Sequence, residues 1–89
     1  MDLDAARAAG VTVVYTPEQN AISVAELVMG LMLSLARPIP AATGSTRSGE
    51  WDRHRFVGVE LYGKTLGIVG LGRIGHRLGL RARAFGMDI

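Results

Sequence analysis

Three glycines in the segment Gly70-Leu-Gly-Arg-Ile-Gly75 are the residues of this 89-residue chain whose spacing points most directly to chemistry. The pattern G-x-G-x-x-G follows an apolar run and opens a helical pattern, which is where a loop that binds the diphosphate of a dinucleotide lies. Gly70 would permit the tight turn, Gly72 would let a phosphate approach the backbone, and Gly75 would let helix and strand pack closely. The predicted diphosphate-binding residues are Gly70, Leu71, Gly72, Arg73, Ile74 and Gly75.

The sequence leaves two questions open at this loop: what the Arg73 side chain contacts, and whether the loop binds a ligand at all. The amides of Gly72, Arg73 and Ile74 would face the anion, and the helix dipole would add to the attraction. The Arg73 side chain either contacts the phosphate or belongs to a solvated stripe with Arg77 and Arg81, since the three are four residues apart. The glycines could also form a plain turn between a strand and a helix, without a ligand.

Strand and helix patterns alternate around the loop and must position it. Val11–Tyr15 is β-branched and aromatic, and Thr65–Val69 is a continuous apolar run, typical of a parallel strand buried on both faces. A helix is predicted over Arg73–Phe85, and Met87–Ile89 resembles the first residues of another strand. This order predicts an α/β fold: a partial Rossmann-type, doubly wound parallel sheet that belongs to a truncated dinucleotide-binding domain.

A second helix is predicted from Ser23 to Arg37, before Pro38. Ser23 and Glu26 have the spacing of a capping box, which predicts that the helix begins there. Its polar positions form one narrow stripe, and the rest of its circumference is apolar. We therefore expect part of this helix to be covered by another domain or by a second subunit.

Composition excludes several classes of partner and site. The net charge is +2 and aromatic residues make up 6%, without a continuous basic stripe, so nucleic-acid binding is not expected. The longest apolar stretch is shorter than the roughly 20 residues of a membrane span. The chain has no Cys, which excludes disulfides and Cys-based metal sites, and no metal site is predicted. Asp2 and Asp4 are unlike a secretory signal, and we expect a cytoplasmic protein.

Several stretches, read together, are more specific than the glycine pattern alone. They are Asp2–Ala6, Val13–Pro17, Asn20–Glu26, Leu35–Arg37, Gly49–Trp51, Glu60–Gly75 and Ala84–Met87. In combination they resemble the D-isomer-specific 2-hydroxyacid dehydrogenases, the group that contains phosphoglycerate, glyoxylate/hydroxypyruvate and formate dehydrogenases.

The resemblance implies a two-domain subunit of which this chain is a fragment. Residues 1–20 would be the end of a substrate-domain segment and the hinge, and residues 21–89 would be the N-terminal part of the NAD(P)-binding domain. It also implies a homodimer through the Ser23–Arg37 helix. Asn20 matches a position at the mouth of the cleft that contacts substrate or nicotinamide, although a turn Asn that bonds its own backbone is an equal alternative.

The implied reaction is hydride transfer between a nicotinamide cofactor and a D-2-hydroxy acid or 2-oxo acid. NAD is favoured over NADP, but the acidic residue that would decide falls about 20 residues after Gly70, past Ile89. The family's catalytic Arg, Glu and His would also lie beyond residue 89. His54 and His76 have surface explanations, so no catalytic residue is assigned, and the chain alone is expected to be inactive.

Two other functions are compatible with the same features. A cofactor-sensing corepressor could use this fold as an interaction module. An unrelated Rossmann protein could share the glycine loop, but the Asn20–Glu26 stretch argues against it.

Overall fold

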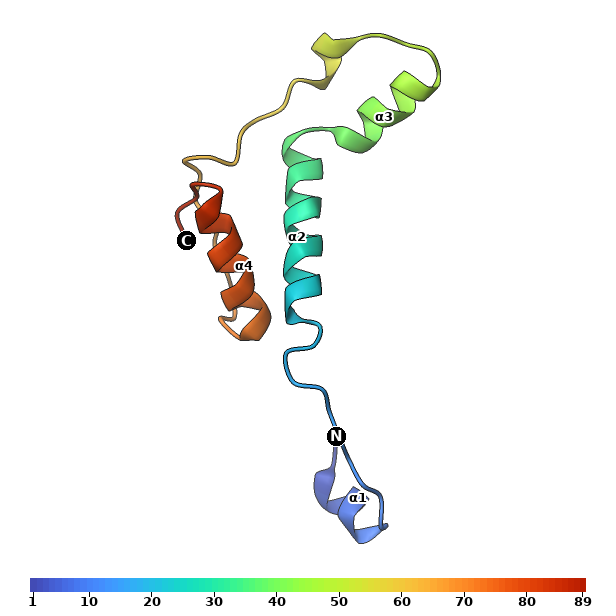
Figure 1. Cartoon of the computed structure of the whole chain (residues 1–89), viewed down its shortest axis with the longest axis vertical. Helices are drawn as coiled ribbons and strands as arrows, with labels where there is room; N and C mark the ends of the chain where they lie inside the picture. Colours follow the sequence, from blue (N-terminus) through green and yellow to red (C-terminus); the bar gives the residue numbers. More distant parts are fainter.

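The computed structural model describes all 89 residues, Met1–Ile89, as an open arrangement of helices and connecting segments (Figure 1). The radius of gyration is 19.7 Å, whereas a compact domain of this length would have one of about 12 Å. Only 8 of the 89 residues are buried. The chain therefore leaves much of its apolar surface uncovered.

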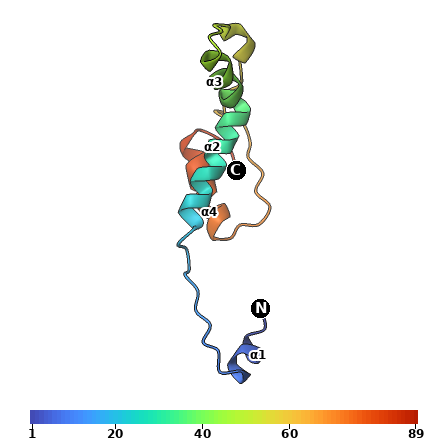
Figure 2. The ribbon, with the colours of Figure 1, turned by 90° about the vertical axis from the view of Figure 1, so that its right-hand side faces the viewer.

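The first helix, α1, spans Leu3–Ala8 and lies apart from the other helices (Figures 1 and 2). The Asp2 side chain caps it by accepting a hydrogen bond of 2.9 Å from the Ala5 amide. The strand predicted over Val11–Tyr15 is not formed. This prediction was wrong because a β-rich sequence becomes a strand only when it packs on a neighbour, and here Tyr15 is 77% exposed.

Helix α2 spans Ala21–Ala36 and is the longest element. It begins two residues before Ser23, with Asn20 as its N-cap residue and no side-chain hydrogen bond to the cap, so the predicted capping box is wrong. The reason lies in the preceding turn, where the Ala21 amide already donates to the Glu18 carbonyl at 3.2 Å. The predicted C-terminal end is confirmed: Arg37 is extended, as expected before a proline.

Helix α4 spans Arg73–Ala84 and packs alongside α2 (Figures 1 and 2). Gly86, at φ +78°, follows the C-cap residue Phe85, so the helix ends where the sequence predicts. The small core between the two helices is formed by Met29, Ala82 and Met87, with Met32, Leu61, Leu66 and Leu78 packed against it. An ion pair between Arg81 and Glu26, at 3.9 Å, also links α4 to α2.

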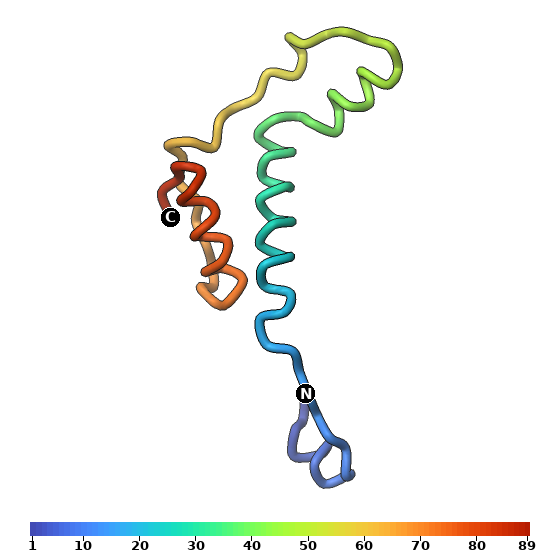
Figure 3. Tube along the Cα trace, in the orientation of Figure 1, coloured from blue at the N-terminus to red at the C-terminus, as the bar shows by residue number.

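The segment before α4 runs back along that helix, as the trace in Figure 3 shows. A single parallel bridge pairs Thr65 with Asp88, where the Leu66 amide donates to the Asp88 carbonyl at 2.7 Å. This bridge is the only part of the predicted sheet that is formed, and the full parallel sheet stays a prediction. The Val69 side chain is fully exposed, which is the environment of a strand without its neighbours.

Helix α3, Ile39–Arg47, and the 3-10 helix η1, Arg53–Phe56, form the remaining part of the chain (Figure 1). None of the helices by itself combines the length and the hydropathy that a membrane span requires. Helices α2 and α3 reach that length and hydropathy only as a pair, bent by 66° at the break between them.

Candidate functional site

The glycine loop has a different structural reason for each of its three glycines. Gly70 has φ +99°, a left-handed backbone conformation that residues with a side chain rarely adopt. A Cβ at Gly75 would lie 2.5 Å from the Gly70 carbonyl oxygen and 3.2 Å from Ile68 Cγ2, so this position brings α4 close to the preceding segment. A Cβ at Gly72 would meet nothing within 4 Å. Gly72 therefore leaves open space at the start of α4.

At the N-terminus of α4, no side chain accepts a hydrogen bond from the first backbone amides of the helix. Gly72 is the N-cap residue and has no side chain that could accept from the first amides of the helix. The first turn contains no acidic residue. Unpaired amides and the positive end of a helix dipole favour an anion at this point, and the backbone geometry therefore fits the diphosphate of a dinucleotide.

A hollow of about 330 Å³ lies in front of this helix end. The residues that line it come from two segments far apart in the sequence: Thr16, Glu18, Asn20 and Ala21 from one, and Gly70, Gly72, Arg73, Ile74 and Gly75 from the other. The structure thus brings Asn20 to the same hollow as five of the six predicted loop residues. The sixth, Leu71, does not line the hollow, and its side chain is 72% exposed.

The two charged side chains of the hollow lie close to each other. Arg73 Nε is 3.9 Å from Glu18 Oε1, and each side chain is more than half exposed. Arg81 has different partners from those of Arg73. Its guanidinium donates to the Arg77 carbonyl oxygen at 3.1 Å and forms an ion pair with Glu26. The three arginines are therefore not one uniformly solvated stripe.

Thr16, Glu18 and Ala21 line the hollow but were not predicted from the sequence, and Glu18 is the charged residue among them. It has φ +63°, uncommon for a residue with a side chain. The Pro17-Glu18 turn chemistry predicts a turn but carries no signal about which distant residues the turn will meet.

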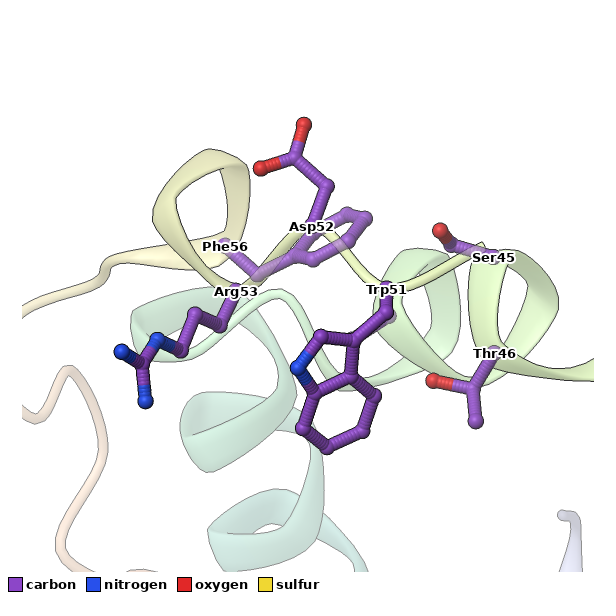
Figure 4. A pocket seen from close by; sticks show the side chains of 7 residues that line it. Ser45, Thr46, Trp51, Asp52, Arg53 and Phe56 are labelled. Carbon is purple, nitrogen blue, oxygen red and sulfur yellow. The ribbon is translucent and has the colours of Figure 1, made fainter. Parts of the chain in front are cut away.

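A second hollow, of about 210 Å³, lies between α3 and η1 (Figure 4). Its lining residues include Ser45, Thr46, Trp51, Asp52, Arg53 and Phe56. Trp51 is 83% exposed, so its side chain forms an open wall of this hollow. The Ser45 hydroxyl donates to Glu50 Oε2 at 2.8 Å, and the Arg55 guanidinium carbon lies 4.7 Å from the centre of the Phe56 ring. These contacts hold the connecting segment together.

No cluster of three or more His, Cys, Asp or Glu side chains is arranged to hold a metal ion. His54 lies in η1 and His76 lies in the first turn of α4, and neither lines the hollow at the glycine loop.

Comparison with known proteins identifies the family. Residues 29–89 match the family described as D-isomer specific 2-hydroxyacid dehydrogenase, NAD binding domain. The chain belongs to this family. The match covers α3, η1, the glycine loop and α4, together with the second half of α2. The family resemblance inferred from the sequence is thereby confirmed, as is an NAD-binding type of domain.

Individual relatives agree with this assignment. The chain is 61% identical over 89 residues to a D-3-phosphoglycerate dehydrogenase of Methanocaldococcus jannaschii, and 55% identical over 87 residues to one of Rattus norvegicus. These alignments include 100% and 98% of the chain but only 17% and 16% of the relatives. The chain therefore spans about a sixth of their length.

Among solved structures, the TT0316 protein from Thermus thermophilus is similar, with a TM-score of 0.87 and 40% identity. The alignment covers 98% of this chain and 29% of that one. The open arrangement of α1, α2 and α4 is thus shared with a longer protein.

Proposed function

We propose that this chain is part of an NAD-dependent D-2-hydroxyacid dehydrogenase. Residues 1–20 are the end of a substrate-domain segment and the hinge, and residues 21–89 are the N-terminal part of the cofactor domain. The observation that carries the proposal is the glycine loop, which leaves open space at Gly72 in front of the uncapped N-terminus of α4. Membership of the family supports the same role.

The loop residues would hold the diphosphate through their backbone. The amides of Arg73 and Ile74 would donate to its oxygens, and Gly72 would let it approach the chain. Asn20 would reach the nicotinamide or the substrate from the other side of the hollow, since it lines the same space. The bound nicotinamide would supply the hydride acceptor, while these residues bind and orient it.

The relatives indicate which substrate to test first. Those from Methanocaldococcus jannaschii and Rattus norvegicus are named D-3-phosphoglycerate dehydrogenase, and we propose D-3-phosphoglycerate, with NAD preferred to NADP. The full-length enzyme should reduce NAD with this substrate faster than NADP, followed by absorbance at 340 nm. The 89-residue chain assayed in parallel should show no turnover, because no histidine lines its hollow to act as the acid–base group. Turnover by the chain alone would contradict the proposal.

We further propose that α2 forms a homodimer contact in the full-length enzyme. Leu27, Leu31 and Leu35 recur every four residues on one face and are 62%, 55% and 86% exposed. An apolar stripe of this kind needs a cover.

Leu31→Glu should therefore raise the dimer dissociation constant by at least about fivefold, because it places a charge in the apolar contact. Sedimentation velocity over a concentration series measures this change. Leu80→Glu is the matched control, since Leu80 is a half-exposed leucine of α4, outside the proposed contact. Equal dissociation constants for the wild type and Leu31→Glu would refute the contact.

A further inference from the structure

Glu18 reaches the glycine loop from a segment more than fifty residues earlier in the chain. Its carboxylate Oε1 lies 3.9 Å from Arg73 Nε, and both residues line the hollow in front of α4. Among the residues that line this hollow, Glu18 is the only acidic one and Arg73 the only basic one. The hollow therefore already contains one carboxylate beside its single cationic side chain.

The turn around Glu18 holds this carboxylate in position. The residue has φ +63°, it follows Pro17, and its carbonyl accepts from the Ala21 amide at the start of α2. The side chain is thus anchored at its backbone and paired at its tip.

The pair itself is easy to break. At 3.9 Å the two atoms are beyond hydrogen-bond distance, and the side chains are 58% and 55% exposed for Glu18 and Arg73. Exposed pairs of this type contribute little to folding stability. An anion that offers several oxygens to Arg73 and to the amides of α4 would make shorter contacts than Glu18 does.

We propose that Glu18 is an internal competitor of the diphosphate: it occupies Arg73 in the free protein and gives it up when a diphosphate binds. This inference rests on the proposed function of the glycine loop. It predicts that the carboxylate lowers the affinity for diphosphate ligands and that it does so through Arg73. It also predicts that a ligand without phosphate does not sense the carboxylate.

The test is calorimetric titration of the full-length enzyme with ADP, which carries the diphosphate, and with adenosine, which does not. Glu18→Gln should bind ADP about threefold to fivefold more tightly than the wild type, with unchanged adenosine affinity. Glu60→Gln is the matched control, because Glu60 is an exposed glutamate outside the hollow, and its ADP affinity should equal that of the wild type.

A second arm tests the route through Arg73. In an Arg73→Gln background, Glu18→Gln should produce no further gain in ADP affinity, because the pair is already absent. Raising the salt concentration to about 0.5 M should shrink the difference between wild type and Glu18→Gln, since exposed charges are screened over a few ångströms. Glu18→Asn repeats the experiment with a residue that tolerates left-handed backbone, so a folding defect of one variant does not decide the outcome.

The outcomes separate this inference from the proposed function. Unchanged ADP affinity in both Glu18 variants, with weaker binding by Gly72→Val, would overturn the competition and leave the diphosphate loop in place. An equal gain with and without Arg73 would also overturn it, because Glu18 would then repel the ligand directly. If Gly72→Val binds ADP as well as the wild type, the loop assignment itself fails.

Discussion

Gly75→Ala should lower the free energy of unfolding of the full-length enzyme by about 1–3 kcal/mol, the range of overpacked sites. The added Cβ would lie 2.5 Å from the Gly70 carbonyl oxygen, a backbone atom that cannot rotate away, and 3.2 Å from Ile68 Cγ2. Alanine is the better helix former by about 1 kcal/mol, but the helix must shift away from the loop to accommodate it. Urea unfolding followed by circular dichroism measures the difference.

Gly79→Ala is the matched control, one turn further along α4. Both glycines are buried in the same helix, but a Cβ at Gly79 would meet Ile68 Cδ1 at 3.6 Å and Ile89 Cγ2 at 3.9 Å, which are ordinary contacts. Gly79→Ala should therefore leave stability unchanged or raise it by up to about 1 kcal/mol. If both substitutions changed the free energy of unfolding equally, close packing would not be the reason for a glycine at position 75.

The helices could be predicted from the sequence because their determinants are local. Pro38 ends α2 and Gly86 follows the last turn of α4, and both ends lie within two residues of the prediction. The start of α2 was misplaced because the turn at Glu18 accepts the hydrogen bond of the Ala21 amide and starts the helix ahead of the capping box expected at Ser23.

The strands could not be predicted in the same way. Val11–Tyr15 and Thr65–Val69 have the composition of strands, but a strand exists only when a neighbour satisfies its backbone groups. Thr65 finds such a neighbour in Asp88, and the bridge is parallel, as predicted for consecutive strands of an α/β sheet. The remaining positions have no partner in this chain.

Residue spacing alone predicted only the part of the candidate site that is contiguous in sequence, whereas Asn20 came from the family resemblance. The spacing of Gly70, Gly72 and Gly75 predicts a loop at the start of a helix, and the structure places it there. Glu18 could not be found this way, because its contact with Arg73 depends on how the segment before α2 turns over the end of α4.

Gly72→Val should reduce the affinity of the full-length enzyme for NADH at least tenfold, about 1.4 kcal/mol, while the fold is retained. A side chain at this position would occupy the open space where the diphosphate has to meet the backbone. The fold should tolerate it, because nothing lies within 4 Å of the added Cβ. Gly72 has φ −86° and ψ −161°, an extended conformation that valine adopts readily. The positive φ of the turn belongs to Gly70 instead.

Titration of NADH into the folded variant, with circular dichroism as the check on folding, measures the effect. Leu71→Val is the matched control, since it places the same side chain one residue earlier, where the native residue does not line the hollow, and its NADH affinity should stay within about twofold of the wild type. Equal NADH affinities of the two variants would show that NADH does not contact the backbone at Gly72. The glycine loop would then be a plain turn. Loss of binding in Gly72→Val alone would place the diphosphate at the N-terminus of α4, because valine at position 71 leaves the open space at Gly72 intact.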